Sequence, residues 1–212
     1  MSQSQILSQL RKQGLVVVVR GDRKEDGVKA SQACISGGIS AIEVAYTNPD
    51  ANLIIADLRQ TYQENPDVLI GAGTVLDPVT ARQAIMAGAS FIVAPSFNEE
   101  VARLCHLYAV PYIPGCMTLT EITRALEAGC EMVKLFPASV FGPSYVSAIK
   151  APLPQVSIMV TGGVNLGNAS TWFAAGVDAI GVGGEFNQLA AQGQFDRIQE
   201  MAAAYAGMVV SS

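Results

Sequence analysis

Short, nearly continuous apolar segments recur along the chain, and a longer stretch with helical periodicity follows each of them. Four of these segments span residues 15–20, 69–75, 111–117 and 157–163. Uninterrupted apolar strands are typical of parallel sheets whose two faces are both covered by helices. The pattern therefore predicts an α/β fold in which strands and helices alternate.

A glycine-led motif that occurs four times supplies the other strands. Its copies are GISAIE from Gly38, GASFIV from Gly88, GCEMVK from Gly129 and GVDAIG from Gly176. Each copy follows a helical stretch, and its glycine suits the left-handed turn that ends a helix. The two sets give eight strands, enough to close a parallel (β/α)8 TIM barrel as a single domain over residues 1–212, with a short N-terminal helix. A doubly wound open sheet is the alternative.

The repeat also predicts which side chains share a level inside the barrel. The last residue of each copy is, in chain order, Glu43, Val93, Lys134 and Gly181. Alternate strands of such a barrel supply the side chains of one interior layer. We therefore expect Glu43 and Lys134 to point inward at one level from opposite sides, with space left between them by Gly181. Their bulky neighbours on the strands would face the outer helices: Ile42, Val44, Val133 and Leu135.

Composition narrows the classes of function. Half of the 212 residues are hydrophobic and 15% are charged, which indicates a large core and some apolar surface buried between subunits. The net charge of −5 argues against a nucleic-acid or anionic-membrane partner, because no basic stripe is available for phosphates. No apolar run reaches the length of a membrane span, and the first residues lack the apolar region of a signal peptide. We expect a cytoplasmic protein.

The cysteines and the histidine limit the chemistry further. Four scattered cysteines without a CxxC pair are expected to be free thiols in a reducing compartment. The single histidine, His106, falls in a helical stretch, so His-based triads and His-rich metal sites are effectively excluded. We expect neither a metal nor a cofactor.

Three charged residues, Arg20, Glu43 and Lys134, fall at inward positions of the predicted strands. A charge inside a barrel is costly unless it is paired or functional, and an ionic plug in the core is the structural alternative. All three lie near C-terminal strand ends, where barrel enzymes place their active sites. The apolar segment MVKLFP around Lys134 favours the neutral, nucleophilic amine, and Glu43 is the carboxylate placed to shuttle protons to it.

This pair of residues suits the aldol cleavage of a 2-keto acid. The amine of Lys134 would attack the ketone, and loss of water would give a protonated imine that withdraws electrons. Cleavage two carbons away would leave an enamine, which is protonated and hydrolysed to pyruvate. Glu43 would take the proton from the substrate hydroxyl.

Further polar groups at the strand ends would complete the site. Thr74 and Thr161 offer hydroxyl groups at the ends of the third and seventh strands. Glycines at the ends of strands seven and eight offer backbone N–H groups for a phosphate or another anion: Gly162, Gly163, Gly183 and Gly184. Tight strand-to-helix turns would need the same glycines, so these residues alone leave both interpretations open.

Motifs over nearly the whole chain, taken in order, resemble one family. They are GISAIEV from Gly38, GAGTV from Gly71, AP from Ala94, PG from Pro114, KLFPA from Lys134 and TGGV from Thr161. The set resembles the 2-keto-3-deoxy-6-phosphogluconate (KDPG) and 2-keto-4-hydroxyglutarate (KHG) aldolases. The resemblance implies a class I aldolase, usually a homotrimer, that yields pyruvate plus glyceraldehyde 3-phosphate or glyoxylate.

The resemblance also implies roles for individual residues. The family's Schiff-base lysine corresponds to Lys134, and its proton-shuttling glutamate corresponds to Glu43. Contacts with the substrate are implied for Thr74, Pro95, Phe136 and Thr161.

Two positions depart from the best-known members of that family. Thr47 stands where many carry an arginine for the substrate carboxylate, and Arg20 is a candidate substitute. Glu185 stands where many carry a serine that helps to hold the phosphate. A carboxylate repels a neighbouring phosphate, so the choice between KDPG and KHG stays open. Alternatively, Glu185 turns away and caps the following segment.

Two other functions are open at this point. Another small phosphate-binding barrel, such as an epimerase or a thiamine-phosphate synthase-like transferase, would need catalytic Asp or His residues or an acidic metal cluster at the strand ends. The predicted strand ends offer little of that kind. The second is a non-catalytic barrel that binds a sugar acid, and the presence of both Lys134 and Glu43 argues against it.

Overall fold

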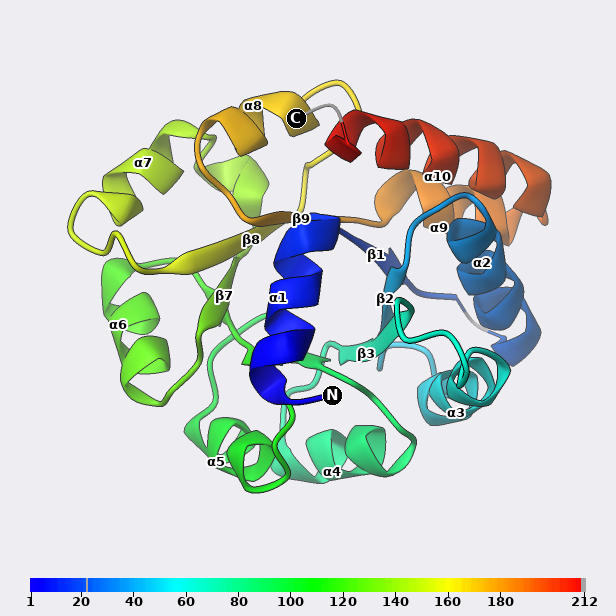
Figure 1. The fold of residues 1–212 in the computed structure, drawn as a ribbon, viewed down its shortest axis with the longest axis horizontal. Coiled ribbons are helices and arrows are strands. Elements are labelled where there is room, and N and C mark those ends of the chain that lie inside the picture. The colour runs from blue at the N-terminus through cyan, green and yellow to red at the C-terminus, as the bar shows by residue number, and fades with distance from the viewer. Residues whose placement is uncertain (22, 211–212) are drawn as a thin grey trace.

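Parallel strands curl into a barrel at the centre of the molecule, and helices surround it (Figure 1). The computed structural model describes residues 1–21 and 23–210. Its strands are β1 (Leu15–Val19), β2 (Ala41–Ala45), β3 (Leu69–Gly73), β4 (Ile92–Val93), β5 (Tyr112–Ile113), β6 (Gly115–Cys116), β7 (Met132–Leu135), β8 (Ser157–Thr161) and β9 (Ala179–Val182).

The barrel closes through the segment that contains Pro114. Within the sheet the order is β5-β4-β3-β2-β1-β9-β8-β7-β6, so the two outermost strands are consecutive pieces of the predicted fifth strand. Proline has no N–H to donate to a ladder, which accounts for the interruption at this residue. The carbonyl of Pro114 still accepts from the N–H of Lys134 on β7, at 2.8 Å. The predicted (β/α)8 barrel is therefore confirmed, with its fifth strand in two pieces.

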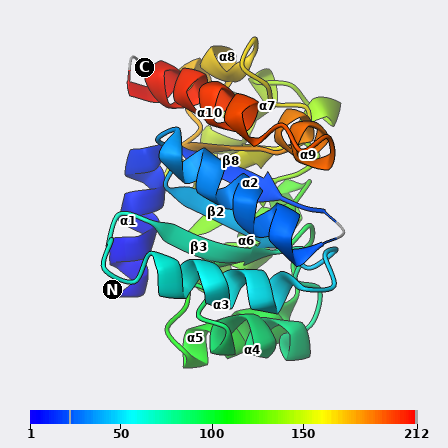
Figure 2. The ribbon, with the colours of Figure 1, turned by 90° about the vertical axis from the view of Figure 1, so that its right-hand side faces the viewer.

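Helices alternate with the strands, as the sequence predicts. They are α1 (Gln3–Gln13), α2 (Lys24–Ser36), α3 (Ala51–Thr61), α4 (Pro78–Met86), α5 (Glu99–Leu107), α6 (Leu119–Glu127), α7 (Ser144–Lys150), α8 (Ala169–Ala174), α9 (Gly184–Ala191) and α10 (Phe195–Val210), with a short 3-10 helix, η1 (Ala138–Val140). Figure 2 shows α2, α3 and α10 covering one side of the barrel.

The glycines of the repeated motif do stand in the left-handed region. Gly38, Gly88, Gly129 and Gly176 have φ values of 97°, 97°, 80° and 95°. An L-residue with a side chain rarely adopts such a conformation, so glycine is the residue that allows each helix to turn into the next strand. The repeat therefore marks real helix-to-strand turns.

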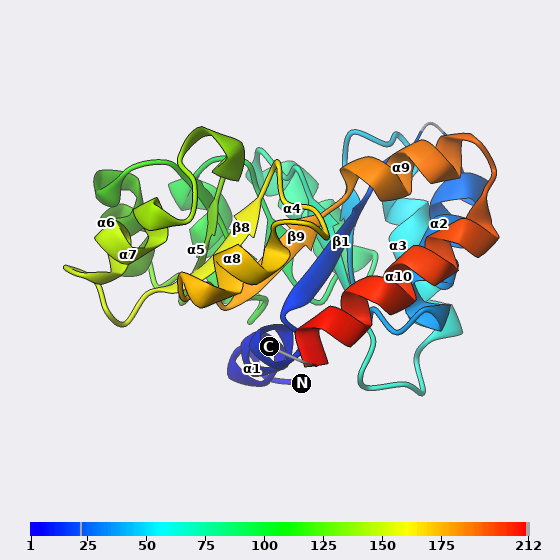
Figure 3. The same cartoon turned by 90° about the horizontal axis from the view of Figure 1, so that it is seen from above.

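The apolar side chains of the strands belong to two clusters, one outside the barrel wall and one inside it. The cluster between the strands and the outer helices includes Ile42, Val44, Val133 and Leu135, as predicted. The cluster inside the barrel includes Val93 and Met132, together with Ile6, Leu7 and Leu10 of α1. Figure 3 shows α1 lying across the end of the barrel where the strands begin. That end is therefore filled with apolar side chains, which leaves the C-terminal strand ends for a site.

Two further features of the described residues concern the length of the helices and the state of the thiols. No helix in the described part of the chain is long and apolar enough to cross a membrane. All four cysteines are free and buried: Cys34, Cys105, Cys116 and Cys130. Burial raises the pKa of each of these thiols to about 12, so they carry little of the reactive thiolate near neutral pH.

Candidate active site

Lys134 and Glu43 meet inside the barrel. Lys134 Nζ donates to Glu43 Oε1 at 3.4 Å, and the two side chains are only 7% and 1% exposed. Their strands, β7 and β2, stand opposite each other, four steps apart in either direction when β5 and β6 are counted as one strand. The structure thus brings together the two residues that the repeated motif places at one level.

Glycines on neighbouring strands leave the space that the polar side chains occupy. A Cβ atom on Gly73 of β3 would collide with the carboxylate of Glu43. A Cβ on Gly181 of β9 would likewise collide with the hydroxyl of Thr161 on β8. These two glycines are therefore required by the functional side chains beside them.

Two polar atoms at this level have no partner within the described residues. Glu43 Oε2 and Thr161 Oγ1 are buried and make no hydrogen bond there. Buried polar groups in folded proteins are nearly always satisfied by protein, water or ligand. Both atoms are therefore available to a bound molecule.

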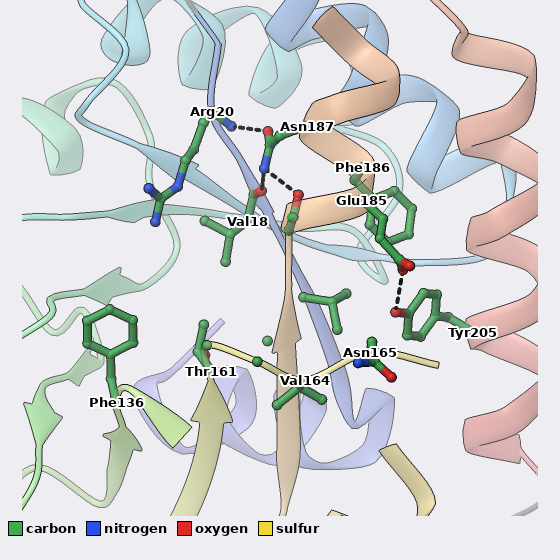
Figure 4. A pocket seen from close by; sticks show the side chains of 16 residues that line it. Val18, Arg20, Phe136, Thr161, Val164, Asn165, Glu185, Phe186, Asn187 and Tyr205 are labelled. Atoms are coloured by element: carbon green, nitrogen blue, oxygen red, sulfur yellow. Dashed lines mark hydrogen bonds between the residues drawn. The ribbon is translucent and has the colours of Figure 1, made fainter. Parts of the chain in front are cut away.

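The aromatic ring of Phe136 links Lys134 to a cavity at the barrel mouth. Lys134 Nζ lies 5.4 Å from the centre of that ring, within the range of a cation–π contact. Phe136 also lines a cavity of about 460 Å³ at the C-terminal ends of β1, β8 and β9 (Figure 4).

This cavity collects eight of the residues that the sequence singled out. They are Arg20, Phe136, Thr161, Gly162, Gly163, Gly183, Gly184 and Glu185. The remaining lining residues are Val18, Val164, Asn165, Gly181, Val182, Phe186, Asn187 and Tyr205. A cavity of this size, with a few polar groups among apolar ones, is typical of a small-molecule site.

Five predicted site residues lie outside the lining of this cavity: Glu43, Lys134, Thr47, Thr74 and Pro95. Thr47 is exposed beyond the end of β2, and Pro95 is half-buried beyond the end of β4. Thr74 is half-buried at the end of β3 and has a φ of 57°. A β-branched residue in the left-handed region is strained, and such residues concentrate at functional sites.

Glu185 lines the cavity, but its carboxylate is engaged elsewhere. The hydroxyl of Tyr205 on α10 donates to Glu185 Oε2 at 3.3 Å, and Figure 4 shows Glu185 directed toward Tyr205, away from Arg20. Burial and the neighbouring carboxylate raise the pKa of Tyr205. Glu185 also stands in the first turn of α9, where a negative charge is stabilised by the free N–H groups of the helix. Glu185 thus turns toward Tyr205 without making a side-chain capping bond to α9, and its effect on a bound anion stays a prediction.

Three polar lining residues escaped the sequence analysis: Asn165, Asn187 and Tyr205. Asn187 and Tyr205 lie on helices whose pattern is that of ordinary outer helices. Asn187 follows Gly183 by four residues, which places it one helical turn beyond a glycine already singled out. That spacing was the sequence signal that could have identified Asn187 as a lining residue, whereas no such signal marks Tyr205.

The described residues hold no group of three or more His, Cys, Asp or Glu side chains arranged for a metal ion. His106, at the exposed end of α5, lies outside the lining of this cavity. Among the described residues, the charged ones that line the cavity are Arg20 and Glu185, and Lys134 lies beside it on the other side of Phe136.

Comparisons with known proteins find relatives over most of the chain. The family model for KDPG and KHG aldolase matches residues 6–201. The chain is 42% identical over 170 residues to the 2-dehydro-3-deoxy-phosphogluconate aldolase of Treponema pallidum, with 80% of each chain covered. It is 34% identical over 192 residues to the 2-dehydro-3-deoxy-6-phosphogalactonate aldolase of Escherichia coli K12, which covers 90% of this chain and 92% of the relative.

A solved structure gives the same result in three dimensions. The KDPG aldolase of Legionella pneumophila, with pyruvate captured as a covalent carbinolamine, superposes with a TM-score of 0.85 at 28% identity. The match covers 93% of this chain and 96% of that one. The chain therefore belongs to the KDPG and KHG aldolase family, and it is an aldolase, a carbon–carbon lyase.

Proposed function

We propose that the chain cleaves a 2-keto-4-hydroxy acid to pyruvate and an aldehyde through a Schiff base on Lys134. The observation that carries this proposal is the buried contact of 3.4 Å between Lys134 Nζ and Glu43 Oε1. Imine chemistry requires a nucleophilic amine with a proton-transfer group within its reach. The carbinolamine held by the Legionella pneumophila relative supports the same chemistry here.

The first half of the reaction forms the imine. Transfer of one proton from Lys134 to Glu43 within the buried pair frees the amine, which attacks C2 of the keto acid. The carbinolamine then loses its hydroxyl as water, with the proton returned by Glu43. The product is an iminium ion on Lys134 beside a Glu43 carboxylate.

The second half breaks the carbon–carbon bond. Glu43 removes the proton of the C4 hydroxyl, the C3–C4 bond breaks, and its electron pair moves to the iminium nitrogen. The aldehyde leaves, and an enamine remains on Lys134. Protonation at C3 by Glu43, followed by addition of water at C2, releases pyruvate and regenerates Lys134. One carboxylate thus serves alternately as acid and base.

The substrate that we propose carries an anionic group at its far end, as KDPG and KHG do. Arg20 shares one cavity with the glycine-rich ends of β8 and β9. A guanidinium and several backbone N–H groups together suit a phosphate or a carboxylate. We therefore assign Arg20 to the distal anionic group rather than to the carboxylate at C1.

We propose that a different set of residues binds the reacting end of the substrate. Thr161 Oγ1 is buried without a partner among the described residues, and we assign it to the substrate oxygens near Lys134. Thr74 follows Gly73, which lies against Glu43, so we assign Thr74 to the C1 carboxylate. Phe136 and Pro95 would form the walls beside the substrate. Thr47 is exposed and uncharged, so it does not replace the arginine that the family resemblance places at this position for the substrate carboxylate.

We also propose a cytoplasmic homotrimer. Val79 and Met86 are 68% and 73% exposed, and both belong to α4. Residues seven apart lie on the same face of a helix, so the two form one apolar surface. Exposed apolar surface of this kind is typical of a contact between subunits.

Borohydride trapping tests the proposed chemistry. Reduction in the presence of pyruvate should add one covalent pyruvyl unit to the chain, and peptide mapping should find it on Lys134. A barrel that binds a sugar acid without imine formation would gain no adduct. The absence of an adduct would therefore reject the Schiff-base mechanism.

A further inference from the structure

We infer that Asn187 is a positioning residue that holds Arg20 over the cavity and thereby determines affinity for the anionic end of the substrate. The inference rests on the proposed function, because it assumes that Arg20 binds that end. Asn187 lies in α9 and lines the same cavity as Arg20.

The side-chain amide of Asn187 uses both of its ends. Its Oδ1 accepts from the backbone N–H of Arg20 at 2.7 Å. Its Nδ2 donates to the carbonyl of Val18 at 2.9 Å and to the carbonyl of Gly183 at 2.6 Å. Figure 4 shows these three bonds between the end of β1 and the start of α9. One side chain therefore joins two segments that are far apart in the sequence.

These three hydrogen bonds of Asn187 form a clamp that lies beyond the end of the ladder between β1 and β9. The last pair in the ladder between β1 and β9 is Val17 with Val182. Beyond that pair, the bonds of Asn187 to the Arg20 N–H and the Val18 carbonyl connect the end of β1 to α9. A Cβ on Gly183 would press against the Val18 carbonyl and Asn187 Nδ2, so this glycine permits the close approach.

Arg20 depends on this clamp because little else fixes it. Arg20 is exposed, and it forms no ion pair with any residue in the ranges 1–21 and 23–210. A long, unpaired side chain loses conformational entropy when it binds a ligand. The bond from Asn187 fixes the backbone from which the guanidinium extends, so the backbone need not be ordered when the ligand binds.

The chemistry of the clamp excludes a carboxylate in its place. Aspartate has the shape of asparagine, but an ionised carboxylate only accepts hydrogen bonds. In Asn187→Asp the acceptor for Arg20 N–H would remain, whereas the carbonyls of Val18 and Gly183 would face a negative charge. Asn187→Asp and Asn187→Ala should therefore have similar effects if the clamp matters, and different effects if Asn187 only fills space.

The experiment compares the anionic end of the substrate with the reacting end. In Asn187→Ala and Asn187→Asp we expect KM for KDPG to rise about tenfold and kcat to change little. A tenfold change in KM corresponds to the free energy of a lost hydrogen bond near a charged group. The pyruvate concentration that gives half-maximal borohydride trapping should stay at the wild-type value, because pyruvate does not reach Arg20. Gln188→Ala, an exposed neighbour on α9, is the matched control and should leave both quantities unchanged.

A double mutant tests whether Asn187 acts through Arg20. The KM of Arg20→Ala/Asn187→Ala should be no higher than that of Arg20→Ala alone, because the clamp has nothing left to position. Additive increases in KM, or a wild-type KM in Asn187→Asp, would overturn the inference. So would a loss of pyruvate trapping in a variant whose circular dichroism is native. If the wild-type chain itself trapped no pyruvate, the proposed function would fail instead.

Discussion

Lys134 and Glu43 are 91 positions apart in the sequence, and their side chains lie 3.4 Å apart inside the barrel. A buried ion pair of this kind is weak evidence for stability, because both groups lose their hydration. Its position at the mouth end of the barrel, next to Phe136 and the cavity, gives it a chemical use instead. The two residues place an amine beside a carboxylate, as the proposed imine formation requires.

Replacement of Lys134 by arginine should abolish imine trapping and cleavage. The guanidinium keeps the positive charge beside Glu43, but it does not deprotonate at a useful pH and cannot act as the nucleophile. Mass spectrometry after reduction with pyruvate measures the adduct. Lys150→Arg, on the outer helix α7, is the control and should trap normally. An adduct mapped to Lys12, Lys24, Lys29 or Lys150 would remove Lys134 from the mechanism.

Glu43→Gln should lower kcat by roughly 10²–10⁴, the usual contribution of general acid–base catalysis. The amide can still hydrogen-bond to Lys134, but it cannot transfer protons. Binding of pyruvate, measured by competition with KDPG, should persist. Near-normal turnover in this variant would mean that water or Thr161 relays the protons.

Gly73→Ala should reduce turnover far more than it reduces stability. The new Cβ would occupy the place of the Glu43 carboxylate, and the displaced carboxylate would move away from Lys134. The control is Gly207→Ala on α10, where a Cβ meets no atom of the described residues within 4 Å. The comparison needs kcat and thermal midpoints for both variants. A wild-type kcat in Gly73→Ala would show that the position of Glu43 tolerates such a shift.

Glu185→Ser should raise kcat/KM for KDPG about tenfold. The substitution removes a carboxylate from the cavity, and with it the repulsion between that carboxylate and a bound phosphate, taken at an effective dielectric constant of about 20. The change for KHG should be much smaller, since that substrate is shorter. Steady-state kinetics with the two substrates measure the difference. Equal responses, or a loss with KDPG, would show that the bond to Tyr205 already keeps Glu185 away from the anion.

Replacement of Met86 by lysine should dissociate the proposed homotrimer. Met86 lies on the exposed apolar surface of α4 with Val79, and a buried lysine without a partner is costly at an interface. Light scattering at micromolar protein should give a trimer mass for the wild type and a monomer mass for the variant. A wild-type chain that is monomeric under these conditions contradicts the proposal.

The sequence alone determined the barrel and its central pair of residues. Side chains alternate along a strand with a period of two, and the motif from Gly38 recurs from Gly129. Equal offsets from these glycines therefore put Glu43 and Lys134 on inward positions of opposite strands. The apolar runs and the glycine turns are local signals, so the strands and helices around them could be predicted as well.

Only the tertiary structure decided how the mouth of the barrel is arranged. Asn187 contacts Val18 and Arg20 from 169 and 167 positions away, and Tyr205 meets Glu185 across two helices. No periodic pattern encodes such contacts, because they depend on where the loops beyond the strand ends bring their side chains. The strands follow from repeating local geometry, whereas the mouth follows from the packing of segments that become neighbours only when the barrel closes.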